Sequence, residues 1–215
     1  MNPLLALETT SEICSVALGY GRIILAESRV APRRHNELIL AMIERLFTAS
    51  ELARDELDLV AFSCGPGSFT GVRMGAGVAQ GIAQGLGINV VPVPTSDAMA
   101  HRARRLNPGL SRFTIKRKSH KGKAYVSHYE VVSGTPECVT PDQLKNVEEI
   151  YRLEHVVSDT DVRVSAEDVL AVALERLDSQ VAPQRALPYL IEGDTPYVEW
   201  GSRRERDDSQ HESRT

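Results

Sequence analysis

The chain has 215 residues, a formal net charge of −4, 42% hydrophobic residues and 25% charged residues. These values are ordinary for a globular protein of one or two domains, and they exclude a fibrous or largely disordered chain. No apolar run approaches the roughly 18 residues that a membrane-spanning helix needs, and residues 1–4 lack the features of a secretory signal. Three scattered cysteines, Cys14, Cys64 and Cys138, favour neither a disulfide framework nor a zinc site, so we expect a reducing cytoplasm.

The first 30 residues predict a three-stranded meander. Runs rich in Val, Ile and Leu at 4–7, 13–18 and 23–30 are separated by short turn sequences, which is typical of strands joined by hairpins. Pro32 ends this meander, and the apolar spacing that follows predicts a helix over 35–50.

Alternating strands and helices follow. The order β-β-β-α-β-α-β-α predicts an α/β fold with a mixed sheet and helices on its faces. These further elements are a strand over 57–63, a helix over 71–86, a strand over 88–93, and a helix that Thr95 or Ser96 caps and that ends at Leu106.

A turn at 107–109 predicts a boundary between a first lobe, 1–106, and a smaller second lobe, 107–200. After Gly201 no apolar residue occurs, so residues 201–215 are expected to be disordered. The second lobe is expected to hold strands over 113–117 and 124–132 and helices that begin at the capping sequences 140–143 and 165–168.

The helix over 35–50 has an apolar arc about twice as wide as one core requires. A monomer would expose part of this arc, and large apolar patches usually mark binding sites. We therefore expect the helix to bind a second copy of the chain or a paralogue. The residues predicted for this interface are His35, Leu38, Ile39, Met42, Ile43 and Leu46.

A glycine loop at 65–71 joins the strand over 57–63 to the next helix. Strand, glycine turn and helix N-terminus together are typical of an anion site, although this spacing is neither a P-loop nor a dinucleotide fingerprint. Pro66 and Gly67 predict a type II turn with positive φ at Gly67, and Ser68 or Thr70 is expected to cap the helix. The alternative is an ordinary turn. The residues predicted to contact a nucleotide or a partner are Gly65, Gly67, Ser68, Thr70, Gly71 and Arg73.

Two charge and composition features complete the pattern. Arg73 lies in the first helical turn, where the helix dipole favours an anionic ligand or carboxylate beside it. The same helix repeats glycine at Gly77, Gly81 and Gly85, which predicts close packing of another backbone segment.

The middle of the chain is basic. From Ala98 to Tyr129 there are nine lysines and arginines and no acidic residue. This asymmetry predicts either an anionic partner or an ordinary solvated face. Lys116, Lys118 and Lys121 are the residues predicted to contact an anion.

The sequence offers little for catalysis. His35 and Glu37 lie on different faces of a helix start, so they favour a cap over a metal site. Glu8, at the end of the first strand, is the one carboxylate in a strand-end turn near the glycine loop.

These motifs together resemble the TsaB (YeaZ) family, glycoprotease-like relatives in the actin/Hsp70/sugar-kinase superfamily. The resemblance is dense from residue 4 to about residue 100 and thinner beyond. The motifs that carry it are Glu8-Thr9-Thr10 with 14–18, His35-Asn36-Glu37-Leu38, the run Gly65-Pro66-Gly67-Ser68-Phe69-Thr70-Gly71-Val72-Arg73-Met74-Gly75 with 79–81, and 92–96, followed more weakly by 124–126 and 188–190.

The resemblance implies a two-lobed actin-like, ribonuclease H-like fold with a degenerate second lobe. It implies a non-catalytic partner of a TsaD-like transferase that places threonylcarbamoyl on the adenosine next to the tRNA anticodon. A TsaE-like ATPase is a further implied partner, a homodimer is implied when the chain is alone, and ATP and Mg are implied only for the assembled complex.

Two departures from the family pattern favour a non-catalytic role. The family usually has Asp at the position of Glu8 and a carboxylate at that of Lys118. Phosphoryl transfer needs carboxylates that hold magnesium, and a lysine would repel the metal. The alternatives are an ATP-dependent kinase or ATPase of the same fold and a glycoprotease-like peptidase.

Overall fold

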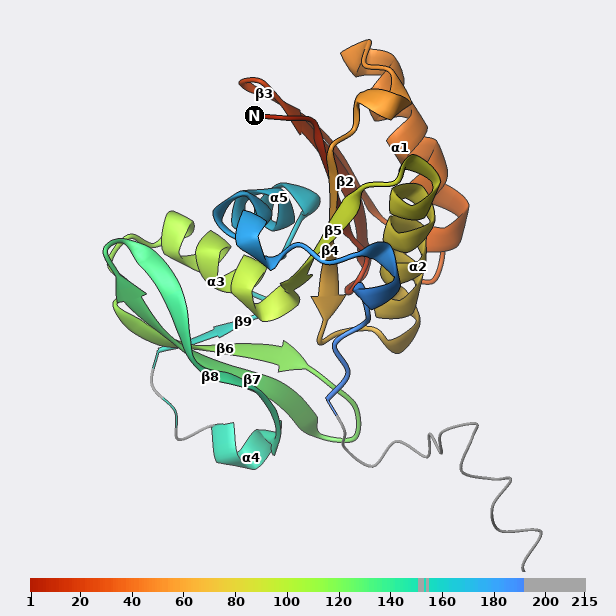
Figure 1. Cartoon of the computed structure of the whole chain (residues 1–215). Coiled ribbons are helices and arrows are strands. Elements are labelled where there is room, and N and C mark those ends of the chain that lie inside the picture. The colour runs from red at the N-terminus through yellow and green to blue at the C-terminus, as the bar shows by residue number, and fades with distance from the viewer. Residues whose placement is uncertain (151–152, 154, 192–215) are drawn as a thin grey trace, which may run out of the picture.

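The structure is a computed structural model, and it describes residues 1–150, 153 and 155–191. In this part of the chain the strands form two sheets, one of five strands and one of four (Figure 1). The tail predicted over 201–215 lies outside the described residues.

The first sheet has the order β3-β2-β1-β4-β5. β1 pairs antiparallel with β2 and parallel with β4, so the sheet is mixed, as predicted. The predicted elements are confirmed here, with ends shifted by one or two residues. The strands are β1 (Leu4–Glu8), β2 (Ile13–Tyr20), β3 (Ile23–Val30), β4 (Leu59–Gly65) and β5 (Asn89–Pro94).

Helices cover both faces of the first sheet (Figure 1). Leu5 and Leu7 of β1 point to the face covered by α1 (His35–Ser50) and α2 (Phe69–Leu86). Leu4 and Ala6 point to the opposite face, covered by α3 (Thr95–Leu106) and α5 (Ala166–Glu175). Successive residues of a buried strand serve two cores in this way because strand side chains alternate.

The second sheet has the order β8-β7-β6-β9. A short helix, α4 (Val147–Ile150), follows β8. The strands are β6 (Arg112–Lys118), β7 (Lys123–Val132), β8 (Thr135–Asn146) and β9 (Val156–Ser158), and three short 3-10 turns lie at Arg54–Glu56, Leu177–Ser179 and Pro183–Arg185.

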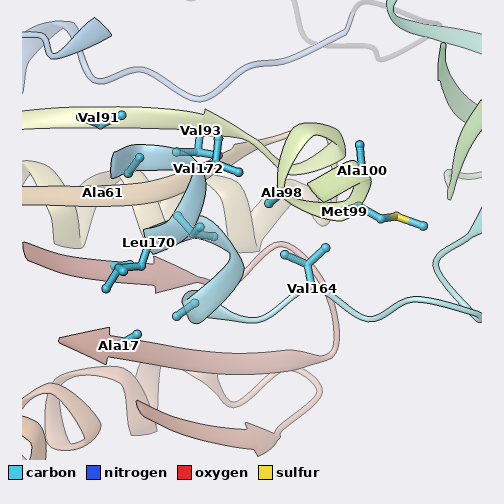
Figure 2. Packing of buried hydrophobic residues seen from close by; sticks show 14 of the residues in the cluster. Ala17, Ala61, Val91, Val93, Ala98, Met99, Ala100, Val164, Leu170 and Val172 are labelled. Carbon is cyan, nitrogen blue, oxygen red and sulfur yellow. The ribbon is translucent and has the colours of Figure 1, made fainter. Parts of the chain in front are cut away.

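One apolar core joins the two sheets. It contains Val91 and Val93 of β5, Met99 of α3 and Leu170 of α5 (Figure 2). Phe113 of β6 belongs to the same core. The chain passes from the first sheet to the second after Leu106, but α5 returns to the first sheet. The lobe boundary at 106 therefore stays a prediction.

The sequence 140–143 was expected to begin a helix, and this expectation is wrong. These residues lie inside β8, where Thr140 pairs with His128 and Gln143 pairs with Val126. Hydrogen bonding along the β7–β8 hairpin outweighs the local capping signal. Asp142, expected in the first turn of a helix, is instead a buried strand residue.

The two other predicted helix caps have opposite outcomes. The N-cap of α3 is Pro94, so Thr95 and Ser96 lie inside the helix and do not cap it. The capping box at 165–168 is confirmed: the Ser165 backbone N–H donates to Oδ2 of Asp168 at 2.8 Å.

Candidate functional site between the two sheets

Glu8 ends β1 at the joint between the sheets and is completely buried. Its Oε1 accepts hydrogen bonds from the backbone N–H of Thr10 at 2.6 Å and from Thr10 Oγ1 at 2.7 Å. Its Oε2 accepts a hydrogen bond from Ser63 Oγ on β4. The carboxylate is thus bound on both oxygens by side chains and backbone of its own sheet.

Arg117 reaches this point from the second sheet. The side chain is buried, and its two terminal nitrogens donate to the carbonyl of Pro66 and, at 3.2 Å, to Thr10 Oγ1. One side chain of β6 therefore contacts the glycine loop and the end of β1. In the sequence, Arg117 stands out only as one of the nine basic residues between Ala98 and Tyr129.

The signal that could have found Arg117 is the alternation along β6. Phe113 and Ile115 are buried, and Arg117 is the next residue on the same face of the strand. A basic residue two positions after two apolar ones in a strand predicts a buried cation.

Two aspartates lie in the same buried zone. Asp142 accepts a hydrogen bond from Ser96 Oγ at 2.6 Å. Asp97 accepts one from the Tyr129 hydroxyl at 2.5 Å and forms an ion pair with Arg176 at 2.6 Å. These bonds connect α3 to the second sheet and to the segment after α5.

Burial dominates the electrostatics of this zone. It raises the pKa of the Glu8 carboxyl, and the nearby Arg117 charge and the hydrogen bonds from Ser63 and Thr10 oppose that rise. Burial also raises the pKa of Asp142, again against the attraction of Arg117. Arg117 is the cation that both carboxylates share.

The glycine loop packs tightly on the end of β1. A Cβ at Gly67 would lie 2.6 Å from the Thr10 carbonyl oxygen, and one at Gly71 would lie 2.0 Å from the Thr9 carbonyl oxygen. Only glycine permits this approach. The expected type II turn is wrong, because positive φ occurs at Gly65 and not at Gly67, and the Gly65–Pro66 bond is cis.

Two of the backbone donors at this helix start already have partners within the chain. Ser68 N donates to the Thr10 carbonyl at 2.8 Å, and Gly71 N donates to Ser68 Oγ at 3.2 Å. Ser68 is therefore the N-cap, and Thr70 lies within the first turn of α2. Arg73 lies over the Phe69 ring and donates to the Phe69 carbonyl at 2.9 Å, so its charge has contacts within the chain.

The predicted interface on α1 needs correction. Ile39, Met42, Ile43 and Leu46 belong to the chain's own core beneath the helix, and they are not available to a partner. The apolar arc is wide because α1 packs on both β2 and β3.

Two other residues of that interface remain to be placed. His35 is buried, with Nε2 at 3.1 Å from the Ile13 carbonyl, and Leu38 is half-buried. The apolar residue that α1 does expose is Leu40, with 62% of its surface accessible.

The outward face of α2 is open and uncharged. A Cβ at Gly77, Gly81 or Gly85 would meet nothing within 4 Å, so the packing predicted for these glycines does not occur within the described chain. From Met74 to Ser96 the sequence has no charged residue. Exposed helix faces normally carry charged side chains, so this face is unusual.

Part of the basic segment is paired with acidic residues of the chain itself. Arg102 and Arg105 form ion pairs with Asp168, and Arg112 pairs with Glu130 at 2.9 Å. Of the three lysines predicted to contact an anion, Lys118 and Lys121 are exposed and Lys116 is half-buried. The Lys118 backbone N–H donates to Asp159 at 2.8 Å.

Two hollows lie away from the Glu8–Arg117 contact. One, of about 480 Å³, is lined among others by Thr114, His128 and His155 on the second sheet. The other, of about 300 Å³, is lined among others by Arg104 and Ala171. Within the described residues no group of three or more His, Cys, Asp or Glu side chains is arranged to hold a metal ion. No helix there is long and apolar enough to cross a bilayer.

Comparison with known proteins gives a matching family and a matching fold. Residues 25–181 match the family described as TsaD: tRNA N6-adenosine threonylcarbamoyltransferase. A solved structure described as YeaZ from Pseudomonas aeruginosa superposes with a TM-score of 0.79 at 29% identity, covering 89% of this chain and 100% of that one.

Curated relatives are named "tRNA threonylcarbamoyladenosine biosynthesis protein TsaB". The one from Haemophilus influenzae is 46% identical over 104 residues, which is 48% of this chain and 44% of the relative. The one from Escherichia coli is 37% identical over 127 residues, which is 59% of this chain and 54% of the relative. The chain thus spans about half the length of the curated relatives it matches.

The fold defines a two-sheet α/β protein of the actin-like class. Its glycine loop packs directly against the backbone that follows β1. The chain belongs to the TsaD family, and within it to the TsaB (YeaZ) group.

Proposed function

We propose that the chain is a non-catalytic partner subunit in the formation of threonylcarbamoyladenosine in tRNA. It acts by binding and activating a TsaD-like transferase. The names of the curated TsaB relatives support the pathway, and the family match supports a paralogue as the binding partner.

The observation that carries the non-catalytic role is the Arg117 guanidinium beside Glu8. Both oxygens of Glu8 accept hydrogen bonds within the chain, and the charge beside it is the chain's own cation. Magnesium–phosphate chemistry needs carboxylate oxygens that are free to bind the metal. This arrangement supports neither the kinase or ATPase alternative nor a peptidase.

The partner surface that we propose is the outward side of α1 and α2, centred on Leu40, Gly77 and Gly81. It exposes Leu40 on α1, it lacks charge over most of α2, and its glycines permit close approach of another helix. When the chain is alone, a second copy is proposed to occupy the same surface.

The decisive experiment is a pull-down of this chain by a tagged TsaD-like paralogue. Gly81→Arg places a long charged side chain on the surface, and the open space around Gly81 means that the fold should tolerate it. We expect binding and tRNA modification to be lost. Ser111→Arg, at an exposed loop position before β6, is the matched control. Normal binding by folded Gly81→Arg would contradict the surface.

The assembled complex is proposed to take its ATP and Mg through a TsaE-like ATPase, so the isolated chain should not turn over ATP. Robust magnesium-dependent ATP hydrolysis by the isolated chain, reduced in Glu8→Gln, would overturn the non-catalytic assignment.

The exposed lysines Lys118 and Lys121, with Lys116, are proposed to contact the tRNA backbone within the complex. Phosphate contacts of this kind add affinity without sequence selectivity. Charge reversal at the three positions should weaken tRNA binding and leave assembly with the paralogue intact. Failure of assembly would indicate an acidic protein partner instead.

A further inference from the structure

Carboxylates from three separate segments attract the charge of the buried Arg117 guanidinium. Glu8 ends β1 of the first sheet, Asp142 lies in β8 of the second sheet, and Asp159 follows β9, and each attracts the Arg117 charge. A buried guanidinium is costly unless acids and hydrogen-bond acceptors compensate its charge. The compensation here comes from both sheets at once.

The hydrogen bonds of the guanidinium connect parts that are otherwise separate. One terminal nitrogen binds the Pro66 carbonyl in the glycine loop, and the other binds Thr10 Oγ1, whose backbone carbonyl also receives Ser68 N of the loop. Arg117 of the second sheet therefore binds both the glycine loop and the end of the first sheet's strand β1.

Glu8 also depends on Arg117 for compensation of its charge. Glu8 is completely buried, and the charge of Arg117 opposes the effect of burial on the pKa of this carboxyl. A buried carboxylate left without a cation is strongly destabilising. Truncation of Arg117 would leave Glu8 without its nearby cation, and it would leave a volume at the Pro66 carbonyl and Thr10 Oγ1, where the guanidinium now donates.

We propose that the joint between the two sheets is a cation site that the chain fills with its own guanidinium, so that Arg117 holds the glycine loop and both sheets together without a bound ligand. Arg117→Ala then creates a site for free guanidinium ion at the Pro66 carbonyl and at Thr10 Oγ1, which itself donates to Glu8.

The test is thermal unfolding of the isolated full chain. Arg117→Ala should melt several degrees below the wild type, and guanidinium chloride at low millimolar concentration should restore part of the loss with saturation. Denaturation by guanidinium requires molar concentrations, so it does not interfere. Sodium chloride at equal ionic strength should not restore the loss. Arg112→Ala, which removes an exposed arginine paired with Glu130, is the matched control and should show no rescue.

A second pair of variants covers the case in which Arg117→Ala does not fold. Arg117→Met leaves the buried Glu8 carboxyl without its cation, whereas Arg117→Met with Glu8→Gln removes both ionisable groups. We expect the double variant to melt above the single one, because it lacks the uncompensated carboxylate.

Three results would overturn the proposal. They are equal melting of Arg117→Met and wild type, a double variant no more stable than the single one, and equal guanidinium effects on Arg117→Ala and Arg112→Ala. Because these measurements use the isolated chain, they stand apart from any test of partner binding.

Discussion

Gly→Ala substitutions on the two faces of α2 should change the stability of the protein in opposite directions. At Gly77 and Gly81 of α2 an added Cβ would meet nothing within 4 Å, so Gly→Ala only removes the entropic cost of glycine in a helix. That cost is about 0.5–1 kcal/mol for each position. The double variant should therefore be more stable by about 1–2 kcal/mol.

At Gly71 the same substitution places the Cβ 2.0 Å from the Thr9 carbonyl oxygen, a distance that requires the backbone to move. Overpacking of this kind costs about 1–3 kcal/mol. The movement would also strain the hydrogen bond from Thr9 Oγ1 to the Gly71 carbonyl, which is 2.8 Å long and buried.

Thermal unfolding of the three proteins side by side measures the effect. For a chain of 150–250 residues each kcal/mol shifts the midpoint by about 2–4 °C, so the double variant should melt about 2–8 °C above the wild type. Gly71→Ala should melt below it. A destabilised double variant, or a neutral Gly71→Ala, would refute the assignment of open and packed faces on α2.

Three further outcomes are expected. Met42→Glu should abolish folding because Met42 is completely buried, whereas Leu40→Glu should fold normally and lose partner binding; native-like circular dichroism of Met42→Glu would contradict this. Asp168→Ala should lower the free energy of unfolding by about 2–4 kcal/mol, because the helix cap and the charge-assisted bonds to arginine are lost. Urea titration measures this change, with Asp168→Asn as the comparison variant. Burial lowers the pKa of His128 below its usual value of 6.5, so the unfolded state binds more protons and stability should fall as the pH drops below about 6.5. His128→Gln should flatten that part of the stability profile, and an unchanged slope would show that another group is responsible.

The local elements of the first sheet were predictable because their signals are strong and agree. Alternating turn and strand residues define β1 to β3, and the capping box at Ser165 defines the start of α5. At 140–143 a cap-like sequence is a strand, because pairing with β7 decides its conformation.

The candidate site was only half predictable. Glu8 and the glycine loop stand out in the sequence, but Arg117 comes to them from another sheet, more than 100 residues after Glu8. The wide apolar arc on α1 predicts a partner beyond the helix's own sheet, but the buried residues of α1 pack within the chain, where the helix contacts β2 and β3 of one sheet. The tertiary arrangement decides which side of a helix stays exposed. On α2 the absence of charged residues from Met74 to Ser96 indicates the exposed, uncharged face, whereas the sequence of α1 gives no comparable sign.

The return of α5 to the first sheet has a consequence for synthesis on the ribosome. The backbone N–H of Ala166 donates to Ser15 Oγ at 2.8 Å, across most of the described chain, and Leu170 shares a core with Leu4. Translation proceeds at about 5–20 residues per second, so one apolar face of β1 stays uncovered for many seconds after it emerges. The nascent first sheet must therefore remain protected or only partly folded until α5 leaves the exit tunnel, and a fragment that ends at Leu106 would keep that face exposed permanently.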